Sequence, residues 1–212
     1  MKQMDKSKHQ QEFLFIANHP CLDFINTEMV IRSTPADLLE SFEDLATWLI
    51  KSRTLSKKDV EVANGELSPD EKTQILTQAK IFRTALRRMV EQIVSEHRVL
   101  ESAVTAINQL LRPCSGYREL ARTGPNAFTE VFVPSVDRKD ALLASLAMFA
   151  SDLLRTADLS LIKKCKNPAC VLYFYDTTKN HARNWCSMQL CGNREKVAAY
   201  FKRKRKNRKN IQ

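Results

Sequence analysis

Four cysteines in the C-terminal part of the chain could bind a metal ion. They form two pairs, Cys165 with Cys170 and Cys186 with Cys191, and four residues lie inside each pair. Fifteen residues separate the pairs. In such a layout each pair presents two thiolates from one tight turn, and the intervening span returns the chain to complete a tetrahedron. Gly192 directly follows the last cysteine, where it can supply the positive φ that such a turn often needs.

We therefore predict one structural Zn²⁺ ion, because a closed shell of four sulfurs leaves no position for a reactive water. Two alternatives are disulfide bonds and buried free thiols. Disulfides require an oxidising compartment, and the polar segment 1–12 has no apolar core that could act as an export signal. Zinc is the favoured interpretation, and we expect Trp185 to pack beside the sulfurs. The lone cysteines, Cys21 and Cys114, are expected to be small buried apolar residues.

Several motifs in this region resemble a known family. They are the C-x-N-P-x-C run at 165–170, W-C-S-M at 185–188 and C-G-N-R at 191–194, which are similar to the CGNR zinc finger of bacteria. The upstream run HPCLDFINT at 19–27 is similar to the opening of the ABATE domain that accompanies this finger. The resemblance covers nearly the whole chain. It implies that the four cysteines are zinc ligands and that the protein is a stress-induced transcription regulator that binds DNA.

The rest of the chain must position this module. Of its 212 residues 43% are hydrophobic, enough for a core, and only four are glycines, which disfavours an all-β fold with many tight turns. We expect a mainly α fold with a small β-hairpin. A helical N-terminal domain at 1–158 would precede a zinc-finger module with a basic helix or tail at 159–212. No apolar run approaches the ~20 residues that span a bilayer, so we expect a cytoplasmic protein without a membrane partner.

Apolar spacing and capping residues predict the individual elements. We expect helices that begin at His19-Pro20, at Thr34-Pro35 (running to Ser52), at Ser56, at Ser68, at Ser102 and after Asp137, and a last helix capped by Asn193. Strands are expected at 13–16 and 171–175, and a hairpin from 117–121 and 128–133. The helix after Ser68 has a capping box with Glu71 and should be the longest. No flexible linker precedes Cys165, so the module should pack on the body.

Four polar residues stand out in an otherwise apolar stretch: His19, Asp23, Asn26 and Arg32. Asp and Asn near helix starts usually bond to the local backbone, and we favour that interpretation. The alternative is that the four residues line a small-ligand pocket or a contact between domains.

Positive charge is concentrated at one end of the chain. The net charge is +10, but residues 163–212 carry fourteen basic and two acidic side chains, a net +12, and residues 1–162 carry −2. A basic end on a near-neutral body predicts an anionic partner, of which nucleic acid is the first candidate. We expect phosphate contacts from Arg183, Arg194, Lys196, Lys202, Arg203, Lys204 and Arg205. Arg194 could instead brace the finger, and the tail after Lys202 should be disordered until it binds DNA.

These observations support a DNA-binding regulator whose helical body senses a small-molecule effector or forms a homodimer. The alternative is a zinc-stabilised interaction or ligand-binding module with only nonspecific affinity for RNA. An enzyme is disfavoured, since the chain has no nucleophile elbow, phosphate-binding loop or H-E-x-x-H helix.

Overall fold

The computed structural model describes residues 12–31, 33–113, 116–134 and 138–209. In chain order the elements are α1 (Pro20–Ile25), β1 (Glu28–Ile31), β2 (Thr34–Asp37), α2 (Phe42–Lys51), α3 (Lys57–Glu66), α4 (Pro69–Glu96), α5 (Glu101–Leu111), β3 (Gly116–Gly124), β4 (Ala127–Pro134), α6 (Arg138–Thr156), the 3₁₀ turn η1 (Leu159–Leu161), β5 (Ile162–Lys164), β6 (Tyr173–Tyr175), the π-helix η2 (Met188–Gly192) and α7 (Asn193–Lys209). The expected mainly α fold is confirmed. The predicted hairpin is β3–β4, and the strand expected at 171–175 is β6, which pairs with β5. The antiparallel pair β1–β2 was not expected.

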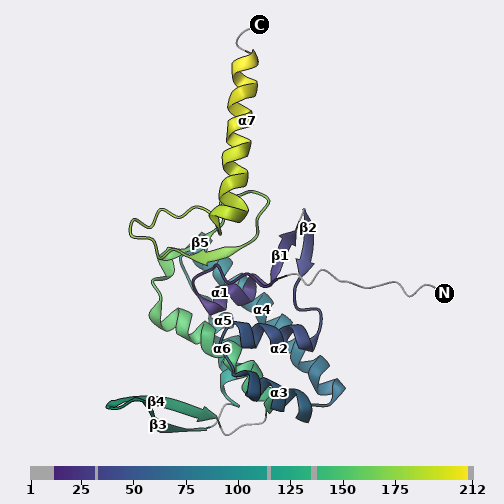
Figure 1. Cartoon of the computed structure of the whole chain (residues 1–212), viewed down its shortest axis with the longest axis vertical. Coiled ribbons are helices and arrows are strands. Elements are labelled where there is room, and N and C mark those ends of the chain that lie inside the picture. The colour runs from purple at the N-terminus through teal and green to yellow at the C-terminus, as the bar shows by residue number, and fades with distance from the viewer. Residues whose placement is uncertain (1–11, 32, 114–115, 135–137, 210–212) are drawn as a thin grey trace, which may run out of the picture.

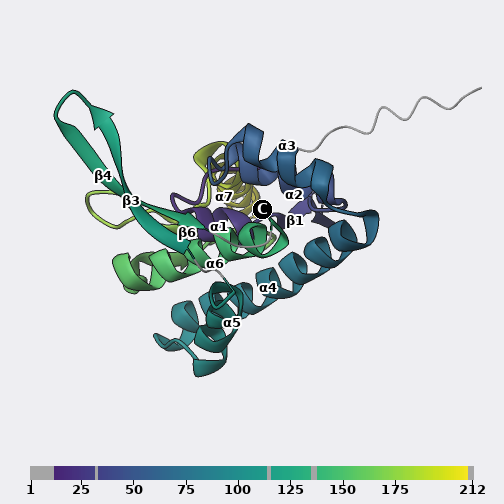
Figure 2. The same cartoon turned by 90° about the horizontal axis from the view of Figure 1, so that it is seen from below.

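The body is built on α4, whose limits follow from its sequence. Ser68 accepts a hydrogen bond from the Glu71 amide, and the Glu71 carboxylate accepts one from the Ser68 amide. This capping box satisfies two amides that have no partner within the helix. The 28 residues of α4 bury an apolar face from Ile75 to Ile93 and end at His97, which adopts the left-handed conformation with φ 54°. Figure 2 shows α4 running beside α6.

The core lies where α1, α2, α4 and α6 meet (Figures 1 and 2). Trp48 of α2 is fully buried there, with its ring 5.1 Å from that of Phe24 and 6.2 Å from that of Phe149. Burying an aromatic side chain of this size removes a large apolar area from water, which stabilises the packing of three helices at once.

The predicted helix start at Thr34-Pro35 is wrong. Residues Thr34–Asp37 form strand β2, in which Pro35 lies opposite Val30, and α2 begins only after its N-cap Ser41. The proline is tolerated because β2 is an edge strand, where one missing N–H is not needed for the ladder. Two other expectations differ: 13–16 is not a strand, and Asn193 does not cap α7, since Ser187 caps the preceding π-helix and α7 continues from it.

The position of β2 is set by an ion pair with α4. Arg83, which is only 4% exposed, donates to both carboxylate oxygens of Asp37 at 2.7 and 2.8 Å and to the Thr27 hydroxyl at 2.8 Å. Burial raises the pKa of Asp37, but the hydrogen bonds from Arg83, the Leu39 amide and Lys80 outweigh it and lower the pKa to about 2. The extended conformation of 34–37 is therefore imposed by a residue almost fifty positions away.

This pKa predicts a pH dependence of stability. The pKa of Asp37 in the folded protein lies below the value of 3.8 that is usual for an exposed aspartate, so the ion pair stabilises the fold above about pH 4 and is lost as the pH falls through about 2. Urea denaturation between about pH 6 and pH 2 should show a larger fall in unfolding free energy for the wild type than for Asp37→Asn. The excess should be at most ~2 kcal/mol, and equal losses in the two proteins would contradict this.

The C-terminal module packs directly on the body, as the sequence predicts. The Asn26 side chain, 2% exposed, donates to the Tyr173 carbonyl at 2.8 Å and accepts from the Tyr173 amide at 3.0 Å. The Tyr175 amide donates to the Ala17 carbonyl at 2.8 Å. Phe174 is fully buried in the same apolar core as the helices. A movement of the module against the body would therefore break buried hydrogen bonds.

Two elements extend away from this packed centre. Helix α7 rises from the finger, and the β3–β4 hairpin leaves the body at the opposite end of the molecule (Figure 1). Within the described ranges, none of the helices has the length and apolar character that a membrane crossing requires.

Candidate metal centre and basic helix

The four paired cysteines meet at one point of the finger. Their sulfur atoms all lie within 4.8 Å of one another, with Cys186 Sγ 3.8 Å from Cys170 Sγ and 3.5 Å from Cys191 Sγ. Cys165, Cys186 and Cys191 are buried, and Cys170 is half-buried. Four sulfurs at 2.3 Å from a central zinc ion, arranged as a tetrahedron, would lie about 3.8 Å apart. The cluster therefore fits a zinc ion with little movement.

Local structure brings each sulfur to this point. Cys165 follows β5, and the Cys170 amide closes a turn by donating to the Asn167 carbonyl at 2.9 Å. The Asn167 side chain supports the same turn by accepting from the Ala169 amide at 2.9 Å. Cys191 lies in the π-helix η2, whose first amides donate to the Ser187 hydroxyl. Each cysteine pair thus depends on one short polar residue that shapes its backbone.

Gly192 has a different role from the one predicted. Its φ is not positive, because it lies within η2. A Cβ atom at this position would lie 2.6 Å from the Met188 sulfur and 3.1 Å from Cδ1 of Trp185. A side chain here would displace the end of Met188 and crowd Trp185, which does pack against the segment that carries the last cysteine.

All of these cysteines are free thiols, as is Cys21, so the disulfide alternative is wrong for the described residues. Cys114 lies outside them. Cys21 is buried as expected, and burial raises its pKa to about 12.

In the cluster, the hydrogen bond from Cys186 is the main cause that lowers the pKa of Cys170 to about 5, whereas burial raises the pKa of Cys191 to about 12. Zinc binding would release the remaining protons, since the ion binds thiolates.

A buried carboxylate organises the loop between the two cysteine pairs. Asp176, which is 0% exposed, accepts from Lys163 Nζ at 2.7 Å, from the Arg183 amide at 3.0 Å and from the Thr178 amide and hydroxyl at 3.0 and 2.6 Å. Burial raises the pKa of Asp176, but the bonds from Lys163 and Thr178 hold it well below its usual range. The loop is therefore anchored by a permanently charged group.

The structure bonds the Arg183 side chain to backbone carbonyls. Its guanidinium donates to the carbonyls of Trp185 (3.0 Å), Ile16 (2.8 Å) and Cys186, and it lies 4.2 Å from the centre of the Phe174 ring. These bonds join the finger to the body beside the sulfur cluster. Sequence reasoning counted Arg183 as a phosphate contact because its charge is visible in the sequence, while the three carbonyls that it satisfies are not.

Replacing Arg183 by glutamine should therefore reduce stability and leave the salt dependence of DNA binding unchanged. The shorter side chain leaves at least two partly buried carbonyls without a donor, and each costs at most about 1–3 kcal/mol. Urea denaturation would measure the loss in unfolding free energy. A smaller salt slope with unchanged stability would restore Arg183 to the DNA-binding surface.

Each described ligand-pocket candidate bonds to a different part of the backbone. The His19 ring caps α1 by accepting from the Cys21 amide at 3.2 Å, and Asp23 accepts from the Ile16 and Ala17 amides at 3.0 and 2.9 Å. Asn26 bonds to the Tyr173 backbone, which is a contact between body and finger. Arg32 lies outside the described residues. Burial raises the pKa of Asp23 to about 6 despite these amides and the nearby Arg183.

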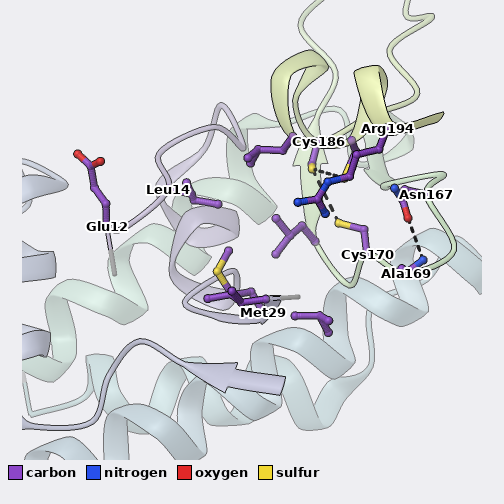
Figure 3. A pocket seen from close by; sticks show the side chains of 13 residues that line it. Glu12, Leu14, Met29, Asn167, Ala169, Cys170, Cys186 and Arg194 are labelled. Carbon is purple, nitrogen blue, oxygen red and sulfur yellow. Dashed lines mark hydrogen bonds between the residues drawn. The ribbon is translucent and has the colours of Figure 1, made fainter. Parts of the chain in front are cut away.

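A cavity of about 300 Å³ does lie beside the sulfur cluster, but His19, Asp23 and Asn26 do not line it. Its apolar walls come from both body and finger: Leu14, Met29, Val30, Ile31, Leu172 and Leu190. Arg194 also lines it, and Figure 3 shows the Arg194 side chain reaching from α7 toward Cys186 and Cys170.

Helix α7 carries most of the remaining basic candidates. Lys196, Lys202 and Lys204 are exposed, and Arg203 and Arg205 occupy the same helix. The expected disordered tail is therefore helical as far as Lys209. Nine basic residues and one acidic residue make the net charge of α7 +8.

Two family comparisons decide what the chain is. The ABATE family, described as "putative stress-induced transcription regulator", matches residues 18–157, and the CGNR zinc finger matches residues 162–204. The chain belongs to the ABATE family. The ABATE match covers most of the helical body, and the CGNR match spans the four cysteines and the first part of α7. The predicted resemblance and the single zinc ion are confirmed. No curated protein matches the chain.

One important residue escaped sequence reasoning. Arg87 on α4 donates to the carbonyls of Val171 (3.2 Å), Ile25 (2.5 Å) and Glu28 (2.8 Å), so it links the long helix to β1 and to the finger. Its only signal in the sequence is a charge on the face of α4 next to Leu86, four residues after Arg83. The three carbonyls become its partners only when the fold brings them together.

Proposed function

We propose that this ABATE protein is a cytoplasmic transcription regulator that binds DNA through helix α7. The observation that carries the proposal is the position of α7: it leaves the zinc finger at one end and extends away from the body (Figure 1), and Lys196, Lys202 and Lys204 are exposed on it. The sulfur cluster lies at the base of this helix, so the zinc ion fixes the direction in which the cations point.

The charge of α7 favours a polyanion as its partner. Like charges on one helix repel one another, and a helix of 17 residues without tertiary packing is marginal in water. Phosphates along the helix remove that repulsion and are the natural partners of lysine and arginine. At 1.5 Å per residue, α7 is about 25 Å long, and the major groove of DNA is wide enough to admit a helix.

The proposed phosphate contacts are Lys196, Lys202, Arg203, Lys204 and Arg205. We leave out Arg183, which bonds to carbonyls, and we assign Arg194 to the finger. A zinc ion with four thiolates carries a net charge of about −2, and Arg194 lines the same cavity as Cys170, Cys186 and Cys191. Its guanidinium would offset part of that charge at the base of α7.

A measurement of affinity against salt concentration tests the proposal. If five phosphates are neutralised, log K should fall against log salt with a slope of roughly −4.5. A slope near zero would contradict DNA binding by α7. Comparing a promoter fragment with random duplex in a mobility assay then separates a regulator from the alternative, a zinc-stabilised module with nonspecific affinity for RNA, since equal affinities support the alternative.

The proposal also covers the domain division and the role of the helical body. We keep the division into 1–158 and 159–212 as a proposal, which the family matches to 18–157 and 162–204 support, although the two parts share one core. Sensing of an effector by the body remains a prediction without a site. No catalytic role is proposed, in keeping with the family's description as a transcription regulator.

A further inference from the structure

Helix α7 carries large apolar side chains among its cations. Val197, Tyr200 and Phe201 are 55%, 54% and 55% exposed, and the centres of the Tyr200 and Phe201 rings lie 5.5 Å apart. Adjacent exposed apolar residues, unlike scattered single ones, mark interaction sites. The phosphate contacts proposed for the cations of α7 give these three side chains no role, so they need an explanation of their own.

The three residues share one face of the helix, which we call the apolar stripe. Their spacing is i, i+3 and i+4, so at about 100° per residue they cover about 100° of the helix surface. Lys196 lies next to Tyr200 at one edge of the stripe, Lys202 lies beyond Phe201 at the other edge, and both lysines are exposed. A surface that fits this face must therefore accept apolar groups at its centre and cations on both sides.

The major groove of DNA has this arrangement. Base edges form its floor, where the C5-methyl group of thymine is apolar, and the phosphates of the two strands border it. A helix that enters the groove with the apolar stripe toward the bases would direct Lys196 and Lys202 toward opposite strands. The stripe and the cations can therefore act in the same complex.

Other occupants of the apolar stripe fit less well. A helix that lies in a lipid surface needs an extended apolar face, but the residues of α7 after Phe201 are all charged or polar. A second copy of α7 would bring together two helices that each carry +8. The family's description as a transcription regulator also favours DNA.

We propose that Val197, Tyr200 and Phe201 contact base edges in the major groove and favour thymine. This inference rests on the proposed binding of DNA by α7 and adds to it the residues that confer sequence preference. Phosphate contacts give affinity for any sequence, whereas an apolar contact with a methyl group distinguishes thymine from the other three bases. The expected preference is therefore for duplexes rich in A·T pairs.

Fluorescence anisotropy of the full zinc-loaded chain tests this preference without a substitution in the protein. Two alternating A·T duplexes are compared, one with thymidine and one with deoxyuridine in its place, which lacks only the C5-methyl group. Both duplexes carry the same phosphates. The wild type should bind the thymidine duplex at least ~3-fold more tightly, as expected when one or more methyl groups leave water.

The double variant Val197→Gln with Phe201→Gln should bind the two duplexes equally. Glutamine removes the apolar contact and keeps helix propensity. The slope of log K against log salt should stay that of the wild type, because no cation is lost. Ile81→Gln is the matched control, since Ile81 is 66% exposed on α4, and it should keep the preference for thymidine.

Equal affinity of the wild type for the two duplexes, at a steep salt slope, would overturn the inference, as would a preference that the double variant retains. Tighter binding to single-stranded thymidine oligomers than to duplex would also overturn it, because it would indicate stacking on unpaired bases. A doubled mass in sedimentation equilibrium without DNA, lost in the double variant, would assign the apolar stripe to a second copy instead. A salt slope near zero would count against DNA binding itself, so the two failures are distinguishable.

Discussion

Replacing Cys186 by serine should reduce zinc content from one ion per chain to nearly none and unfold the finger. Cys186 is 1% exposed, and its sulfur lies within 3.8 Å of two other sulfurs in the cluster. Structural zinc supplies on the order of 10–16 kcal/mol of apparent binding free energy in small finger peptides, and a three-sulfur site would lose much of it. Zinc content and far-UV circular dichroism would measure both effects.

The loss should extend beyond the finger. Tyr173 and Phe174 belong to the same buried core as the helices, and Asn26 bonds to the Tyr173 backbone. The body of Cys186→Ser should therefore unfold at a lower temperature than that of the wild type. The control is Cys21→Ala, another buried cysteine outside the cluster, which should keep its zinc and lose about 1 kcal/mol of stability. Zinc retained at one ion per chain in Cys186→Ser would exclude the four-sulfur site.

Substituting the four central cations of α7 with glutamine should weaken DNA binding and reduce its salt dependence together. The variant combines Lys202→Gln, Arg203→Gln, Lys204→Gln and Arg205→Gln. Each phosphate contact contributes about −0.9 to the slope of log K against log salt, so losing four contacts should make the slope less steep by up to ~3.6. Glutamine is a good helix former, so α7 should persist.

A charge-matched control separates α7 from the overall charge of the protein. Lys57, Lys58, Arg98 and Arg112 are exposed on the body, and replacing all four with glutamine gives the same net charge as the α7 variant. The control should keep the slope of the wild type. If both variants lose slope equally, binding reflects net charge alone, and α7 is not the specific surface that we propose.

Short-range patterns predicted the helices reliably where the chain supplies its own caps. Ser56 and Ser68 cap α3 and α4 as expected, because a serine hydroxyl and the amide three residues later are close in any helix start. The same approach failed at Thr34-Pro35. There the decisive partner was Arg83, and local propensity gives no information about a contact of that range.

The roles of individual basic residues also depend on contacts that the sequence does not show. The sequence shows that Arg183, Arg194 and Lys202 are all cationic, and it cannot distinguish them further. In the structure, Arg183 bonds to three carbonyls, Arg194 lines the cavity beside the sulfurs, and Lys202 is exposed on α7. One carbonyl partner of Arg183, that of Ile16, lies 167 positions away in the sequence.

By itself the sequence determined that the chain binds zinc through two cysteine pairs, belongs to the ABATE family with a CGNR finger, and carries its excess positive charge at one end. These properties depend only on residue type and on spacing along the chain, and both are visible in the sequence. The tertiary structure alone decided that the finger shares the core of the body and that Arg183 bonds to carbonyls of both parts. Each of these follows from which distant backbone carbonyls, amides and apolar surfaces come together, and only folding brings them into contact.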